Sequence, residues 1–158
     1  MRPLTAQIEK ALHRQPDPDM QGSFGLIGNS RAMRNLYSQI ERAAACDVAV
    51  LVSGDRGTGK ERVARAVHSH SSRASGPFIA LNCAAMLPSL MESELFGYEK
   101  DAFAHAEEPK RGLIETASGG TLMLDEIGEL PLDLQTSLLR FLDNQVVTPL
   151  GSTRTQKV

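Results

Sequence analysis

The sequence lacks a long apolar run, and its charges of opposite sign nearly balance. Its longest apolar stretch, residues 48–52, is far shorter than the roughly 20 residues that a membrane-spanning helix needs. The first residues also lack the apolar core of a signal peptide. These absences predict a cytoplasmic protein without membrane contact. The 17 basic and 19 acidic residues give a formal net charge of −2, so we expect no strongly basic surface and no direct DNA binding by this segment.

Cysteine is also scarce. The wide separation of Cys46 and Cys83 fits neither a zinc site nor a disulfide framework, which indicates free thiols in a reducing compartment. We expect both to be small buried side chains. The length of 158 residues fits one domain, and a content of 41% hydrophobic and 23% charged residues is typical of a folded globular chain.

The first 23 residues differ from the rest. Apolar residues at helical spacing predict a short helix there, carried by Leu4, Ile8, Ala11 and Leu12. Residues 15–23 combine prolines and a glycine with polar residues, which is typical of a linker. We interpret residues 1–23 as a terminal helix and tail, with a coupling segment to a sensory domain as the alternative. The predicted domain spans residues 24–158.

From Phe24 onward, helical and strand-like patterns alternate. Apolar, β-branched runs predict buried strands at residues 48–52, 78–81 and 121–124. Apolar residues at helical spacing predict helices from near Ser30 to residue 44, and at residues 60–71, 88–96 and 132–144. This alternation predicts an α/β fold with a mainly parallel sheet.

A glycine-rich segment directly follows the first predicted strand and opens a helix. It consists of Gly54, Asp55, Arg56, Gly57, Thr58, Gly59, Lys60 and Glu61. Glycines let the backbone approach phosphates closely, successive N–H groups at a helix start attract anions, and a lysine adds a positive charge. This context predicts a phosphate-binding P-loop rather than an ordinary turn. Glu61 stands where most P-loops carry the Ser or Thr that binds Mg²⁺, so another carboxylate must hold the metal.

Two carboxylates, Asp125 and Glu126, follow the last predicted strand. The carboxyl ends of parallel strands are where α/β sheets bind their ligands. We expect Asp125 to hold Mg²⁺ and Glu126 to polarise the water that attacks the terminal phosphate of ATP. The alternative is a solvated acidic surface.

Several motifs in order resemble one family. They are Leu-Ile-Gly-Asn-Ser at 26–30, the glycine-rich segment at 54–61, Leu-Asn-Cys-Ala at 81–84, Glu-Ser-Glu-Leu-Phe-Gly at 92–97, Gly-Gly-Thr-Leu-Met-Leu-Asp-Glu at 119–126 and Leu-Leu-Arg at 138–140. From Phe24 to the end, the chain resembles the first part of the sigma-54-interaction domain, the AAA+ ATPase of bacterial enhancer-binding regulators. The resemblance implies a three-layer α-β-α P-loop ATPase fold, and the family typically carries Glu after the P-loop lysine.

The resemblance also implies roles for single residues. Asn82 matches the asparagine that holds the catalytic glutamate, here Glu126, and Leu26, Ile27 and Gly28 are expected near the adenine. The implied assembly is a hexameric ring with ATP between subunits, and the implied partners are RNA polymerase and its sigma factor.

One loop departs from the family pattern. Where the family has Gly-Ala-Phe-Thr-Gly-Ala, the loop that contacts sigma-54, this chain has Asp101-Ala-Phe-Ala-His-Ala106. Phe103 is kept, but Ala104 and His105 replace Thr and Gly, and Asp101 replaces the other Gly. Non-glycine residues restrict the loop's conformations, and the loss of Thr removes a hydroxyl group. Our hypothesis is that this protein regulates transcription without the usual sigma-54 contact.

The second departure lies at the C-terminus. Domains of the family continue into a sensor strand, trans-acting arginines and a helical lid, none of which occurs in this sequence. The missing strand belongs between the P-loop strand and the strand that ends at Asp125, so the resemblance implies an incomplete sheet with unpaired edges. Hydrolysis without arginine fingers is expected to be inefficient.

Two function classes remain open. The first is an ATPase motor segment of a transcription regulator. The second is a nucleotide-responsive binding or assembly module with little turnover. A small-molecule phosphotransferase is a weaker third reading, because it leaves the motif at residues 92–97 unexplained.

Overall fold

The structure, a computed structural model, describes residues 22–158. Its α-helices are α2 (Arg31–Ala44), α3 (Lys60–Ser69), α4 (Pro88–Phe96), α5 (Leu113–Thr116) and α6 (Leu132–Asn144). Its strands are β1 (Phe78–Asn82), β2 (Gly97–Tyr98), β3 (Lys110–Arg111), β4 (Thr121–Asp125), β5 (Val146–Val147) and β6 (Gln156–Lys157), and two 3₁₀ turns span Cys83–Ala85 and Ile127–Glu129. The helix and linker predicted before residue 22 lie outside the described residues.

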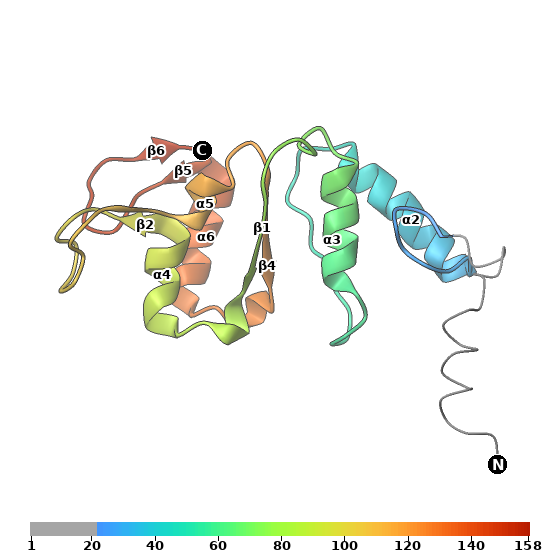
Figure 1. Cartoon of the computed structure of the whole chain (residues 1–158), viewed down its shortest axis with the longest axis horizontal. Coiled ribbons are helices and arrows are strands. Elements are labelled where there is room, and N and C mark those ends of the chain that lie inside the picture. Colours follow the sequence, from blue (N-terminus) through green and yellow to red (C-terminus); the bar gives the residue numbers. More distant parts are fainter. Residues whose placement is uncertain (1–21) are drawn as a thin grey trace, which may run out of the picture.

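The centre of the fold is the parallel pair β1 and β4. Their register runs from Phe78 opposite Thr121 to Asn82 opposite Asp125. Helix α3 lies on one side of this pair, and α4, α5 and α6 lie on the other (Figure 1). The short strands form two antiparallel pairs, β2 with β3 and β5 with β6. Helices on both sides of parallel strands confirm the predicted α/β arrangement.

The predicted helix boundaries match the structure closely. Ser30 caps α2, because its hydroxyl accepts a hydrogen bond of 3.2 Å from the Met33 N–H. Proline occupies the first position of α4, where its missing N–H costs nothing. In residues 22–158, no helix is long and apolar enough to cross a bilayer.

Two apolar clusters hold the helices in place. The larger one joins β1, α4, α5, α6 and β5 through Leu81, Cys83, Met91, Leu95, Phe96, Ile114, Leu130, Leu134, Leu138 and Val147. The smaller one joins α2 to α3 through Tyr37, Ile40 and Ala66. The helix that follows the P-loop is thus packed on α2 rather than in the main core.

Side chains in the second half of α3 connect this helix to the central strands. His68 is buried, and its Nδ1 lies 2.9 Å from the hydroxyl of Thr121 at the start of β4. Its ring packs against Phe78 of β1 with a centroid separation of 5.3 Å. The Arg65 guanidinium lies 4.5 Å from the centre of the Phe78 ring. These contacts fix the C-terminal half of α3 against the first residues of both strands.

The strand predicted at residues 48–52 is wrong, because this segment forms no strand and pairs with none. Within residues 22–158, no backbone-to-backbone hydrogen bond involves residues 48–53. The side chains of Val48, Val50 and Leu51 are 64%, 47% and 82% exposed. A cavity of about 650 Å³ lies between this segment and β4. A β-branched run becomes a strand only where another strand accepts its backbone groups, and the described residues place none beside it.

The two cysteines differ. Cys83 is 1% exposed, which confirms its predicted burial, and burial raises the pKa of its thiol, with the Asp125 carboxylate adding to the effect. The burial predicted for Cys46 is wrong, since this residue is exposed. It lies in the turn after α2, beyond the last buried residue of that helix, Ala44.

Hydrogen exchange tests the unpaired segment. We expect amides of residues 48–52 to exchange at opening free energies of about 0 kcal/mol, and those of β1 to need several kcal/mol, about 5 in a domain of ordinary stability. Exchange followed by NMR or by mass spectrometry of peptides compares the two segments in one sample, so β1 is the internal control. Equal protection of both segments contradicts this description.

Candidate functional site

The phosphate loop is shaped by glycines and closed by its own backbone. Gly57 and Gly59 have φ angles of 81° and 93°, which other residues adopt only with strain. Gly59 also precedes the first residue of α3, and no side chain caps that end of the helix. The N–H groups of its first turn therefore remain available to an anion, which the helix dipole favours.

Polar groups within the loop bond to the loop itself. The Thr58 hydroxyl donates to the Asp55 carbonyl at 2.8 Å. Lys60 Nζ donates to the carbonyls of Gly54 and Asp55, both at 3.2 Å. The lysine ammonium thus lies against the loop backbone, where an entering phosphate is a stronger acceptor than a neutral carbonyl.

The strand ends carry the second set of polar groups. Asn82 and Asp125 are opposite each other at the carboxyl ends of β1 and β4. The Asn82 side-chain oxygen accepts from the Ala84 N–H at 2.9 Å, and the Asp125 carboxylate accepts from the Glu126 N–H at 3.1 Å. Glu126 has a φ of 53°, a left-handed conformation that costs a non-glycine residue roughly 1–2 kcal/mol. Its exposed side chain leaves the strand at a sharp turn.

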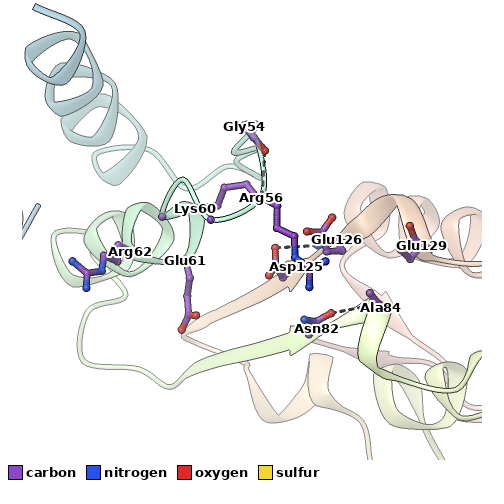
Figure 2. Close-up of a pocket in the computed structure, with 12 residues that line it drawn as sticks. Gly54, Arg56, Lys60, Glu61, Arg62, Asn82, Ala84, Asp125, Glu126 and Glu129 are labelled. Carbon is purple, nitrogen blue, oxygen red and sulfur yellow. Dashed lines mark hydrogen bonds between the residues drawn. The ribbon is translucent and has the colours of Figure 1, made fainter.

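The loop and the strand ends line one cavity of about 580 Å³ (Figure 2). Among the predicted site residues, it brings together Gly54, Arg56, Gly57, Gly59, Lys60, Glu61, Asn82, Asp125 and Glu126. Asp55 and Thr58 belong to the loop but do not line this cavity. Residues more than 60 positions apart in the sequence thus face a common space large enough for a nucleotide.

The residues expected near the adenine lie apart from this cavity. Leu26 packs on the cluster between α2 and α3, and the Gly28 carbonyl accepts a 2.7 Å hydrogen bond from the Tyr37 hydroxyl. Ile27 is 71% exposed. This segment rests on the helix that follows the phosphate loop, but the structure does not bring it to the cavity wall.

Sequence reasoning missed one carboxylate of the cavity. Glu129 lines the same space from the short 3₁₀ turn that follows Glu126. The spacing of Glu129 could have indicated this position, because a residue three positions after Glu126 lies on the same side of a 3₁₀ turn.

The cavity offers oxygen ligands that suit Mg²⁺. They are the carboxylates of Glu61, Asp125, Glu126 and Glu129 and the amide oxygen of Asn82. Within the described part of the chain, no three His, Cys, Asp or Glu side chains converge closely enough to hold a metal by themselves. This donor set fits Mg²⁺ held by one or two carboxylates, nucleotide phosphates and water.

The loop that departs from the family pattern connects β2 and β3, at the end of the molecule opposite α2 (Figure 1). Asp101 and His105, which replace the two glycines, have positive φ angles of 63° and 92°. The Asp101 N–H donates to the Ala106 carbonyl at 2.8 Å, and the rings of Tyr98 and Phe103 pack edge to face at 4.9 Å. Asp101, Phe103, Ala104 and His105 are exposed, whereas Ala106 is buried. The loop thus keeps a glycine-like backbone without glycines.

With this site in place, the family is clear. The chain belongs to the sigma-54 interaction domain family, whose model matches residues 26–158. It is 57% identical over 126 residues to the transcriptional regulator VasH of Vibrio cholerae, covering 80% of this chain and 24% of VasH. It is 50% identical over 133 residues to the regulatory protein AtoC of Escherichia coli, covering 84% of this chain and 29% of AtoC. The chain thus spans less than a third of these relatives.

The similarity extends to solved structures. The crystal structure of NtrX from Brucella abortus in complex with ATP superimposes with a TM-score of 0.76 at 38% identity, over 98% of this chain and 31% of NtrX. The NtrX complex with ADP gives the same TM-score at 39% identity. With the family match, this similarity confirms the predicted α/β fold of the P-loop ATPase type.

Replacing Asp101 and His105 with glycine tests the strain in the β2–β3 loop. A left-handed conformation costs a non-glycine residue roughly 1–2 kcal/mol. Glycine removes this cost, but the greater entropy that it gives the unfolded chain lowers stability by about 0.4–1 kcal/mol at each position. We expect the double variant to be more stable by about 1 kcal/mol, with a thermal midpoint about 2–4 °C higher. Calorimetry or thermal circular dichroism measures the change.

Ala104→Gly is the matched control in the same loop. Its φ is not positive, so glycine brings only the entropic cost and lowers stability by about 0.4–1 kcal/mol. A loss of stability in both variants argues against strain at Asp101 and His105.

Proposed function

We propose that residues 24–158 form the ATP-binding domain of a bacterial transcription regulator of the sigma-54 activator type, preceded by a helix and linker in residues 1–23. The observation that carries the proposal is the single cavity in which the phosphate loop faces Asn82, Asp125 and Glu126. The NtrX complex with ATP, in a chain that aligns over nearly all of this one, supports the choice of nucleotide.

In this proposal, the backbone of residues 54–59 and the first turn of α3 bind the phosphates. Lys60 leaves the two loop carbonyls and bonds to the phosphate oxygens, which are charged and therefore stronger acceptors. Asp125 holds Mg²⁺, which neutralises phosphate charge when bound. By resemblance, the adenine extends beyond the phosphate cavity to Leu26, Ile27 and Gly28, which do not line that cavity.

We also propose roles in hydrolysis for residues of the same cavity. Glu126 orients and polarises the attacking water, because its carboxylate lies next to the metal ligand Asp125 at the strand end. By resemblance to the family, Asn82 holds Glu126 in its inactive position until the terminal phosphate is bound. By resemblance, hydrolysis takes place in a cytoplasmic hexameric ring with ATP between subunits, and RNA polymerase with its sigma factor is the partner.

The loop between β2 and β3 favours a second candidate function. Asp101 and His105 occupy glycine-like conformations and present carboxylate and imidazole groups where the family presents glycine. The alternative is a nucleotide-responsive assembly module with little hydrolysis, which regulates transcription without remodelling sigma-54.

Two substitutions separate binding from turnover. Lys60→Ala removes a charge-assisted contact worth about 1.5–3 kcal/mol, so we expect ATP affinity to fall by roughly 10- to 150-fold. Glu126→Gln keeps the shape of the side chain but not its basicity, so ATP binding is expected to remain and hydrolysis to disappear. Calorimetric titration and a phosphate-release assay measure the two effects.

The wild-type chain decides between the two candidate functions in the same assays. Turnover that rises steeply with protein concentration indicates a ring-forming motor, whereas binding without turnover indicates the assembly module. ATP binding that is unaffected by Lys60→Ala contradicts the phosphate-loop assignment, and unchanged hydrolysis in Glu126→Gln removes the role of that residue.

Open-complex formation tests the loop. We expect a sigma-54 activator that carries residues 97–106 of this chain in place of its own loop to lose activity. The matched control carries the same insert with Asp101→Gly, Ala104→Thr and His105→Gly, and it is expected to regain activity. Full activity with the unaltered insert favours the usual sigma-54 contact.

A further inference from the structure

Arg56 is the phosphate-loop residue whose side chain leaves the loop. It lines the cavity shared with the strand ends, and its side chain points from the loop toward Asp125 and Glu126 (Figure 2). Within residues 22–158, no carboxylate lies within 4.0 Å of its guanidinium, and none of the hydrogen bonds of this part of the chain involves it. Among the residues that the structure describes, the group is therefore a cation without a protein partner, and it lies over the cavity.

The other cations near this cavity are placed differently. Lys60 Nζ bonds to the carbonyls of its own loop at 3.2 Å. Arg65 bonds to Glu61 at 2.7 Å and covers Phe78. Arg62 also lines the cavity, but its side chain points away from the strand ends (Figure 2). Arg56 is thus the basic side chain that faces the carboxylates across the cavity.

A cation at this position suits a nucleoside triphosphate. Its first two phosphates lie along the loop and the helix start, where backbone N–H groups and Lys60 meet them. In the proposed binding mode, its third phosphate extends toward Asp125, which holds Mg²⁺, and toward Glu126 and Glu129, whose carboxylates repel it. A guanidinium bonds phosphate oxygens in a two-pronged geometry and reduces this repulsion.

We infer that the Arg56 side chain binds the terminal phosphate of the nucleotide and makes the site selective for triphosphates over diphosphates. This inference rests on the proposed ATP binding. It adds that a residue of the same chain contacts the third phosphate and so distinguishes triphosphates from diphosphates. A diphosphate ends at the loop, so its binding does not depend on the Arg56 side chain.

Calorimetric titrations with Mg²⁺, using ADP and a non-hydrolysable ATP analogue, test the inference. We expect Arg56→Ala to raise the dissociation constant of the ATP analogue by about tenfold or more and that of ADP by less than about threefold. Arg56→Lys keeps the charge but not the two-pronged geometry, so it is expected to fall between wild type and Arg56→Ala.

Arg62→Ala is the matched control. It removes the same charge from another residue that lines the cavity, but its side chain points away from the strand ends, so the ratio of the two dissociation constants is expected to stay at the wild-type value. A circular dichroism spectrum and thermal midpoint for each variant confirm that the fold is retained.

Three results overturn the inference. Equal weakening of both nucleotides by Arg56→Ala indicates a general charge effect, and no weakening indicates no contact. If Arg62→Ala changes the ratio of the two dissociation constants as much as Arg56→Ala does, the effect does not depend on the position of Arg56. In these cases wild type still binds nucleotide, and the proposed function survives. A wild-type chain that binds neither nucleotide overturns the proposed function and this inference together.

Discussion

The in-register pairing of β1 with β4 is the constraint on which the site depends. Because the strands are parallel and end together, the polar residues that follow their apolar runs arrive at the same edge. Asn82 is opposite Asp125 for this reason, although 42 residues separate them in the sequence. A shift of one residue in the register would move Asn82 away from Asp125 and turn the side chains of one strand to the opposite face.

The position of the phosphate loop depends on a smaller set of contacts. In the described residues, no strand ladder connects the segment before the loop to β4. The loop is instead placed through α3, whose contacts with the central strands are made by His68 and Arg65 in its second half. Since the loop lies at the opposite end of this helix, the position of the phosphate loop relative to the strands depends on the orientation of α3.

Much of the fold could be predicted because its signals are local. Ser30 at the start of α2 and Pro88 at the start of α4 mark helix ends by backbone chemistry that needs no distant partner. The apolar pattern predicted a strand at residues 48–52 that does not form, because strand hydrogen bonds need a neighbour. The family resemblance, not the pattern, indicated that this neighbour is lacking. The same contrast between local signals and distant partners applies to the site. Motif spacing indicated the phosphate loop and Asp125, but not the carboxylate of Glu129, the direction of the Arg56 side chain, or the positive φ of His105.

The cavity beside the phosphate loop has walls from two parts of the molecule that share little packing. One wall rests on the α2–α3 cluster, and the other rests on the main core. A ligand that contacts both walls adds its binding free energy to the few contacts that join them. Ligand occupancy and the rigidity of the whole domain are therefore thermodynamically linked, and saturation at 100 times the dissociation constant contributes about 2.7 kcal/mol to the folded state. In this sense a bound nucleotide is a structural element of the domain.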